Sequence, residues 1–127
     1  MAGSINKVIL LGRLGADPEV RVSQDGKKIA KFSLATSESW RDKVSNEKKE
    51  KTEWHKVVIF SSGLAEISEK YLKKGSLIYI EGQISSRKYT DQSGIEKYIT
   101  EIVLQGYNCQ LTMLDNRGEN PDSGDNI

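Results

Sequence analysis

Alternation of apolar and polar side chains with a period of two runs through most of this chain. Over residues 28–36, Ala30, Phe32 and Leu34 fall on one side of an extended backbone, with other residues between them. Residues 77–89 repeat the pattern, with isoleucines at three of the even positions. A period of two is typical of a β-strand that buries one face. The sequence therefore predicts a mainly β protein.

Turn signals divide the chain into seven extended segments. Asp25-Gly26 and Asp91-Gln92-Ser93-Gly94 are typical of hairpin turns, and Ser45-Asn46 is a plausible turn inside the charged segment 41–51. The predicted extended segments are 5–14, 19–23, 28–36, 52–60, 76–89, 95–104 and 107–113.

One segment has a helical period instead. Leu64, Ile67, Tyr71 and Leu72 fall on one face at helical spacing, and Lys73-Lys74-Gly75 follows with basic residues and a glycine. Short strands with a single helix among them are typical of a small closed β fold. We therefore expect an all-β fold, a five-stranded Greek-key OB-fold barrel with one short helix between the third and fourth strands.

The composition predicts one domain followed by a different kind of segment. The 127 residues suffice for one domain. Residues 1–114 hold 18 Lys and Arg against 14 Asp and Glu, a net charge of +4, whereas residues 115–127 carry a net charge of −3 and one aliphatic side chain. Such a tail cannot bury enough apolar surface to offset its ordering entropy. We expect an OB-fold domain over 1–114 and a disordered acidic start of a C-terminal tail over 115–127.

Several functions are disfavoured by what the sequence lacks. One cysteine, Cys109, and one histidine, His55, leave no ordinary zinc-ligand set, so no metal and no cofactor are expected. His55 alternates with apolar residues, which favours a packed or interface histidine over a catalytic base, and no nucleophile elbow or Walker-type loop is present. No apolar run could span a membrane, and no secretory signal is evident. The sequence predicts a cytoplasmic protein that is not an enzyme, with Cys109 reduced and buried.

Aromatic side chains alternate with cations on the face expected to lie outside the barrel. Trp54, Lys56 and Phe60 share one side of their strand, Tyr89 follows two cations, and Trp40 begins the charged hairpin. Unpaired bases stack on aromatic rings while a basic track follows the phosphates. The pattern is therefore typical of a surface that binds a single-stranded nucleic acid.

The residues alone leave other interpretations open. Trp40 and Trp54 could pack on each other or under a loop, and the hairpin rich in lysine and glutamate could serve solubility only. The aromatic residues could anchor a protein partner, in which case the domain would be an interaction module. Stacking and phosphate contacts would also serve RNA as well as DNA.

Longer stretches of sequence resemble a known family. The chain is similar to the bacterial single-stranded DNA-binding proteins over about residues 5–114. The resemblance rests on these segments: Asn6-Lys7-Val8-Ile9-Leu10, Gly12 with Leu14-Gly15, Asp17-Pro18-Glu19-Val20-Arg21, residues 34–43 around Trp40, Thr52-Glu53-Trp54-His55, Tyr71-Leu72-Lys73-Lys74-Gly75-Ser76, Tyr79-Ile80-Glu81-Gly82-Gln83 and Arg87-Lys88-Tyr89-Thr90-Asp91.

The resemblance implies sequence-independent binding and protection of single-stranded DNA in replication, recombination and repair, by a cytoplasmic, nucleoid-associated homotetramer. It implies stacking by Trp40, Trp54, Phe60 and Tyr89, the last at a position where family members often have tryptophan. The implied phosphate contacts are Lys7, Arg21, Arg41, Lys43, Lys56, Lys73, Lys74, Arg87 and Lys88. The implied subunit contacts are His55, Tyr79, Glu81 and Gln83.

Two departures from the family pattern stand out. Ser61-Ser62-Gly63 is one residue longer than the usual link into the helix and lacks a basic residue often found there. The family also recruits replication and repair proteins through an acidic C-terminal tip with a terminal aromatic residue. This sequence stops at Asp125-Asn126-Ile127 without that tip. We expect that the sequence is truncated rather than that the protein has lost the recruitment of partners.

Overall fold

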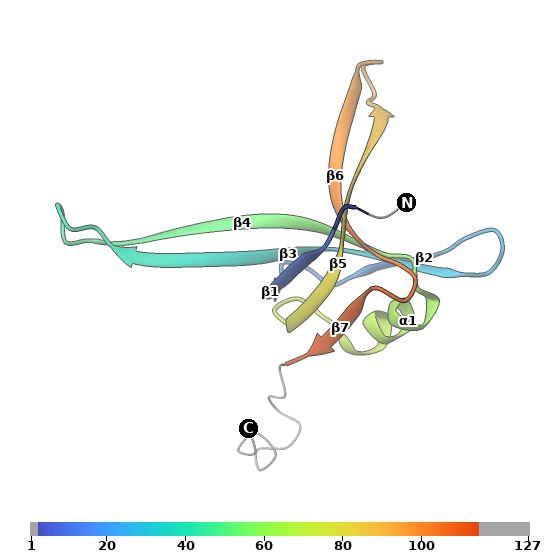
Figure 1. The fold of residues 1–127 in the computed structure, drawn as a ribbon, viewed down its shortest axis with the longest axis horizontal. Helices are drawn as coiled ribbons and strands as arrows, with labels where there is room; N and C mark the ends of the chain where they lie inside the picture. The colour runs from blue at the N-terminus through green and yellow to red at the C-terminus, as the bar shows by residue number, and fades with distance from the viewer. Residues whose placement is uncertain (1–2, 115–127) are drawn as a thin grey trace, which may run out of the picture.

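The computed structural model describes residues 3–114, which form seven strands and one helix (Figure 1). The predicted acidic tail, residues 115–127, lies outside the described residues. The elements are β1 (Val8–Leu14), β2 (Glu19–Val22), β3 (Lys28–Arg41), β4 (Lys48–Ile59), α1 (Ser62–Tyr71), β5 (Leu77–Thr90), β6 (Glu96–Leu104) and β7 (Gln110–Met113).

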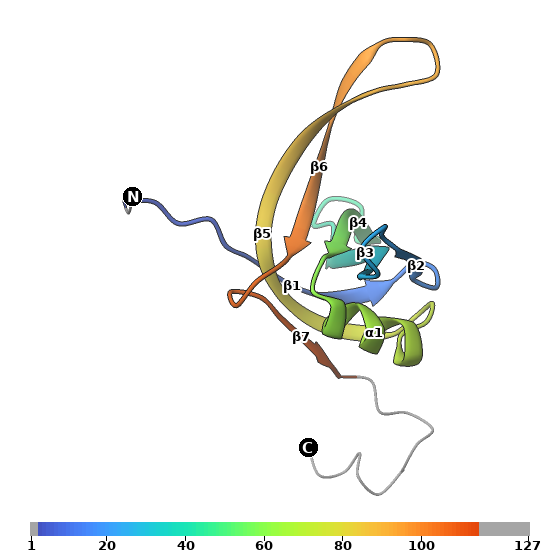
Figure 2. The same cartoon turned by 90° about the vertical axis from the view of Figure 1, so that its right-hand side faces the viewer.

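The strand pairings close on themselves. β1 pairs with β3 and β5, β3 pairs with β4, β4 with β6, and β6 with β5. Only the β4–β6 pairing is parallel, and β2 and β7 are added to this circuit on β3 and β5 respectively. Figure 2 shows how strongly β5 curves around the body, which lets one strand contact β1, β6 and β7.

The structure has seven strands where five were expected; five of them form the closed circuit, and α1 lies between β4 and β5, the third and fourth of these five along the chain. Each of the seven extended segments predicted along the chain overlaps one of these strands, although β3 and β4 extend well beyond the predicted segments 28–36 and 52–60. β2 is separate from β1 because Pro18, which has no N–H to donate to a ladder, lies between them. β7 is separate from β6 because the chain turns at Gly106, whose φ is +76°.

Two hairpins extend beyond the body as arms (Figure 1). β3 and β4 pair without interruption from Ala30–Ile59 to Arg41–Lys48, so residues 41 and 48–51 of the charged segment are strand and residues 42–47 form its tip. The expected turn at its tip is confirmed, with Asn46 at φ +62°. The expected turn between β5 and β6 is also confirmed, because the N–H of Asp91 donates to the carbonyl of Ile95 at 3.0 Å.

The core lies inside the closed circuit of strands. Its side chains alternate along β3 and the first half of β5 as the sequence predicted, with Leu34, Ile59, Ile78, Ile80 and Leu104 fully buried. In β4 the alternation fails at Val58, which lies on the side of Lys56 yet is 3% exposed. Burying an aliphatic side chain of this size contributes about 1.5–3 kcal/mol relative to leaving it exposed. Within the body, the inward sides of the strands therefore pack against one another, and the outward sides remain available for binding.

The helix buries part of the face that the sequence predicted, because Leu72 is buried and Leu64 packs against the core. Ala65 and Ser68 are fully buried, whereas Tyr71 is 63% exposed and Ile67 is 36% exposed. Small residues allow the helix backbone to approach β3 closely, and the hydroxyl of Ser68 is satisfied by donating to the carbonyl of Leu64 at 2.9 Å. The close approach of α1 to β3 therefore favours the small Ala65 and Ser68 at the contact and leaves the larger Ile67 and Tyr71 toward solvent.

Candidate nucleic-acid interface

Trp54 presents its indole ring to solvent from the middle of β4. Its neighbour across the sheet is Ala35 of β3, and alternation places it on the outward side of the strands. The benzene part of the indole lies against Gly15, where an added Cβ would come within 2.5 Å of Cζ3 of Trp54. The side chain still remains 59% exposed. The ring is therefore held on one side and open on the other, as a platform for stacking requires.

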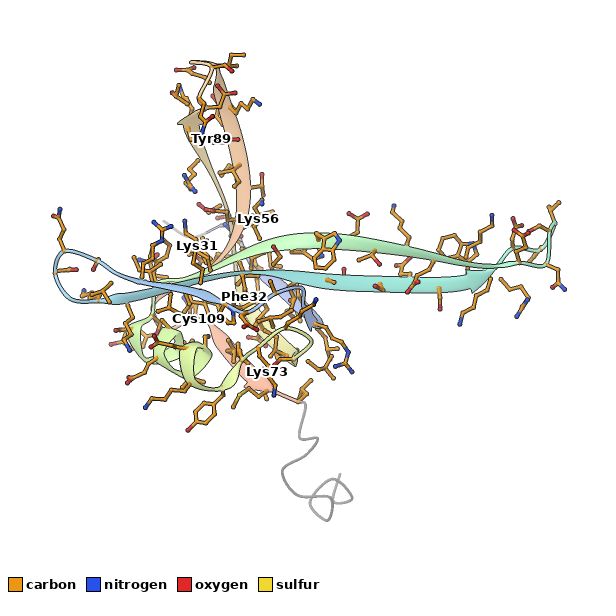
Figure 3. All side chains as sticks on the ribbon, turned by 180° about the vertical axis from the view of Figure 1, so that it is seen from behind. Lys31, Phe32, Lys56, Lys73, Tyr89 and Cys109 are labelled. Carbon is orange, nitrogen blue, oxygen red and sulfur yellow. The ribbon has the colours of Figure 1, made fainter. Side chains whose placement is uncertain are left out.

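Three cations line a hollow on the same outward side. Lys56 lies two residues after Trp54 on β4, Lys31 comes from β3 and Arg87 from β5. Figure 3 shows Lys31 and Lys56 at the foot of the arm made by β5 and β6. The hollow continues to Phe60, which shares a pocket with Lys31 and Arg87. We call this surface the basic groove, and define it by Lys31, Lys56, Phe60, Arg87 and Glu101.

A second hollow adjoins the basic groove at Lys56. It is lined by Trp54 from β4 and Tyr98 from β6, and Tyr98 is 72% exposed. Lys56 and Ile99 line both hollows. A continuous path therefore runs from Phe60 to Trp54, with aromatic rings and cations along its length.

The cations of the basic groove differ in their pairing. Arg87 holds Glu101 through two contacts, Nε to Oε1 at 3.1 Å and Nη2 to Oε2 at 3.3 Å. The hydrogen bonds and the charge of Glu101 raise the pKa of Arg87 further above its usual range. Within residues 3–114, neither Lys31 nor Lys56 has a carboxylate within ion-pair distance. The two lysines are thus the groove cations that are not held in an ion pair, although Asp17 and Glu19 line the same hollow.

Two predicted stacking residues lie on the arms rather than in the groove. Trp40 is 49% exposed and lies five residues beyond Ala35 on β3, roughly 17 Å further along the arm. Because the register is unbroken, alternation places Trp40 and Trp54 on opposite sides of the hairpin. Tyr89 is 39% exposed near the end of β5, and Figure 3 shows it well out on the second arm.

Several predicted phosphate contacts also lie on the arms. Arg41 ends β3, where its Nη1 donates to the carbonyl of Asn46 at 2.7 Å, and Lys43 is in the same tip. Lys88 lies on β5 with its Nζ 3.6 Å from Glu96 across the hairpin. These cations would reach a ligand that continues from the body along either arm.

The remaining predicted phosphate contacts lie away from the basic groove. Lys7 pairs with Glu81 at 3.3 Å, and Arg21 on β2 pairs with the glutamate two residues before it at 3.2 Å. Lys73 and Lys74 follow α1, and Figure 3 shows Lys73 at the other end of the body from the arm that carries Tyr89. Of the nine predicted contacts, the structure brings Lys56 and Arg87 together in the groove.

The predicted subunit contacts on β5 form a patch of their own. The hydroxyl of Tyr79 donates to Oε2 of Glu81 at 2.6 Å, which lowers the pKa of Glu81 and raises that of Tyr79. Two half-exposed aliphatic residues of β1 lie opposite these positions, Ile9 against Glu81 and Leu11 against Tyr79. We call Ile9, Leu11, Tyr79, Glu81 and Gln83 the outer face.

His55 lies apart from the outer face. Its Nε2 is 2.9 Å from the hydroxyl oxygen of Thr36 on β3, and its ring lines the second hollow beside Trp54. Within one chain the structure therefore does not bring His55 together with Tyr79, Glu81 and Gln83.

Sequence reasoning missed three residues of this surface. Lys31 shares the outward side of β3 with Ser33, opposite Lys56 and its neighbours, so alternation of paired strands could have identified it. Tyr98 shares its side of β6 with the buried Ile102 and Leu104, so alternation would have placed it in the core; it is exposed because it lies out on the arm. Glu101 could not have been found in this way, because its burial depends on the pairing of β6 with both β4 and β5.

Few other groups in the described part of the chain suggest chemistry. Residues 3–114 contain no cluster of three or more side chains that could hold a metal ion. None of the described helices is long and apolar enough to cross a membrane. Cys109 is only partly buried, which corrects the expectation of a buried cysteine, because it immediately precedes β7 and packs against the edge of the core. That partial burial raises the pKa of its thiol.

The fold and this surface define a small β protein that offers aromatic rings and cations along a groove, a class that binds extended polyanions. The chain belongs to the single-strand binding protein family, whose model matches residues 5–113, and the resemblance read from its motifs is thereby confirmed.

Relatives of high identity carry the same designation. A protein of Rhizobium meliloti (strain 1021) named single-stranded DNA-binding protein is 60% identical over 118 residues, which are 93% of this chain and 68% of that protein. One of Rickettsia typhi with the same name is 58% identical over 120 residues, 94% of this chain and 79% of that protein. Among solved structures, the Plasmodium falciparum SSB complex with ssDNA has a TM-score of 0.80 at 40% identity, covering 91% of this chain and 99% of that one.

Proposed function

We propose that this protein binds and protects single-stranded DNA without regard to sequence, in DNA replication, recombination and repair. The observation that carries the proposal is the indole of Trp54, held against Gly15 yet 59% exposed, beside a groove with two unpaired lysines. Every base has a π face, so stacking on such a ring tolerates any sequence. The relatives support the proposal, because they are named for binding single-stranded DNA.

The path of the strand is proposed to follow the two adjoining hollows and then the arms. Trp54 and Phe60 would stack on bases in the body, while Lys31, Lys56 and Arg87 contact phosphates. Residues on the arms and at the edges would engage a longer strand. These are Trp40, Tyr89, Lys7, Arg21, Arg41, Lys43, Lys73, Lys74 and Lys88.

The closed circuit of β1, β3, β4, β6 and β5 supports the further proposal that the domain is a five-stranded OB-fold barrel. In this assignment β2 and β7 are additions to the barrel strands, and α1 caps one end. We propose no enzymatic role, in keeping with relatives that are named as binding proteins.

The protein is also proposed to assemble as a homotetramer, in the cytoplasm and on the nucleoid. Ile9 and Leu11 leave apolar surface half-exposed beside Tyr79, which an assembly would cover. His55, on a separate surface of the chain, would contribute to a second contact. Recruitment of replication and repair proteins through an acidic C-terminal tip stays a prediction from the resemblance.

The proposal is tested by titrating the protein in parallel with single-stranded DNA, duplex DNA and RNA of equal length, while following tryptophan fluorescence. We expect tight binding of the single-stranded DNA with quenching, since Trp54 would stack on a base. Equal or tighter binding of the duplex would contradict the proposal. Tighter binding of RNA than of DNA would instead assign the protein to RNA.

A further inference from the structure

Three acidic side chains line the hollows of the basic groove, and Glu101 is the one that is buried and lines both, whereas Asp17 and Glu19 lie at its edge. Glu101 of β6 is 7% exposed and is the one charged residue among the buried side chains of the described chain. It lines both pockets of the groove, together with Lys31 and Arg87. A carboxylate at this position faces the space in which a phosphate backbone would lie.

Glu101 neutralises the charge of one groove cation. Its two oxygens accept from Nε and Nη2 of Arg87, so the pair has the bidentate geometry of a strong ion pair. A guanidinium has five N–H donors, and the three that remain can still reach a ligand. The pair as a whole carries no net charge, however, so a phosphate beside it gains hydrogen bonds with little electrostatic attraction.

We infer that Glu101 sets the strength of DNA binding by neutralising Arg87 within the basic groove, so that the protein holds single-stranded DNA less tightly than its cations would allow. The inference rests on the proposed function and concerns what sets the affinity of the same groove for DNA. Arg87 then acts as a directional hydrogen-bond donor, while Lys31 and Lys56 supply the attraction that depends on salt.

The obvious alternative is an ion pair that serves folding only. Two observations favour a role in binding. Glu101 lies in the lining of the groove rather than in the core, so its charge acts directly on whatever occupies that space. An ion pair whose arginine side chain is 52% exposed also contributes little net stability, because solvent screens the attraction between the charges.

The test is a salt series on the full chain with an oligothymidine, comparing the parent with Glu101→Gln. The amide retains the size of the side chain and one acceptor while removing the charge. We expect the slope of log affinity against log salt to become steeper by about 0.7, which corresponds to roughly four-fold tighter binding near 0.15 M salt. An unchanged slope or weaker binding by a folded Glu101→Gln protein would overturn the inference.

The matched control is Glu66→Gln. Glu66 is also an ion-paired carboxylate, 3.7 Å from Lys70, but it lies on α1, which lines neither pocket of the groove. Its substitution makes the same change in net charge, and we expect the slope to stay that of the parent. An equal increase in both variants would show an effect of net charge alone and would overturn the inference.

A double variant, Glu101→Gln with Arg87→Gln, keeps the test valid if the single variant does not fold. It removes both charges, so the net charge of the groove is unchanged. We therefore expect the slope of the parent together with weaker binding at every salt concentration, because the hydrogen bonds that Arg87 donates are lost. A slope shallower by about 0.7 would show that Arg87 acts as a full phosphate contact in the parent, contrary to the inference. Absence of binding by the parent protein would instead refute the proposed function.

Discussion

The basic groove and the outer face both expose apolar side chains, but their neighbours differ. In the groove and the hollow beside it, Trp54 is open to solvent next to Lys56, which has no carboxylate partner within residues 3–114. On the outer face, Leu11 lies beside Tyr79, whose hydroxyl is already bound to Glu81. Exposed apolar surface next to uncompensated cations suits a polyanion, whereas the same surface next to satisfied polar groups suits another protein surface.

The largest effect is expected from a charge on the outer face. Leu11→Glu would place an unpaired carboxylate in the proposed subunit contact, where its desolvation is costly. Because Leu11 is already half-exposed in the single chain, the fold should survive. Sedimentation equilibrium should show loss of the tetramer. Val44→Glu, at a residue 95% exposed on the arm tip, serves as the control and should leave the assembly intact. A tetramer that persists in Leu11→Glu would remove the distinction between the two surfaces.

A smaller effect is expected from removing the ring in the second hollow. Trp54→Ala should weaken binding of an oligothymidine of about eight nucleotides by about 1–3 kcal/mol, because one stacked base is lost. Trp40→Ala should matter mainly for longer strands, since Trp40 lies out on the arm. Fluorescence titrations with short and long oligonucleotides measure both. If Trp54→Ala binds as tightly as the parent and the parent shows no quenching, the tryptophans are structural.

The loss of a groove lysine should reduce the dependence of DNA affinity on salt concentration. Lys56→Gln removes about one phosphate contact, so the salt slope should become shallower by about 0.7 for a single strand. Lys70→Gln, on α1, is the matched control and should leave the slope unchanged. Affinities measured across a salt series would contradict the assignment if the two lysines behaved alike.

The smallest effect concerns the tip of the second arm. Asp91 accepts hydrogen bonds from the N–H groups of Ile95 and Ser93, and it lies near Lys97, so its pKa falls below the ordinary value of 3.8. Because the pKa of Asp91 is lower in the folded than in the unfolded chain, the ionised carboxylate stabilises the turn at any pH above the unfolded pKa. That contribution is lost as the pH falls through the folded pKa. Amide resonances of Ser93 and Ile95 should therefore shift with a midpoint below pH 3.8. A midpoint at or above that value would show that the turn does not depend on the carboxylate.

The sequence by itself determined which side of each strand is buried. The period of two assigned Leu34, Ile59 and Ile78 to the core and Trp54 and Lys56 to the outward side, because a pleated strand offers no other arrangement. The hairpin turns at Asn46 and at Asp91 could also be predicted, since their residue types favour the backbone conformations of tight turns.

Only the tertiary structure decided which outward side chains meet. Lys31, Lys56 and Arg87 come from three strands, and their approach depends on how the circuit of pairings closes. The packing of Leu64 and Leu72 was predicted, but the exposure of Ile67 and Tyr71 was not, because close approach of α1 to β3 favoured the smaller Ala65 and Ser68. A local pattern specifies the face of one element, whereas register and packing between elements specify its neighbours.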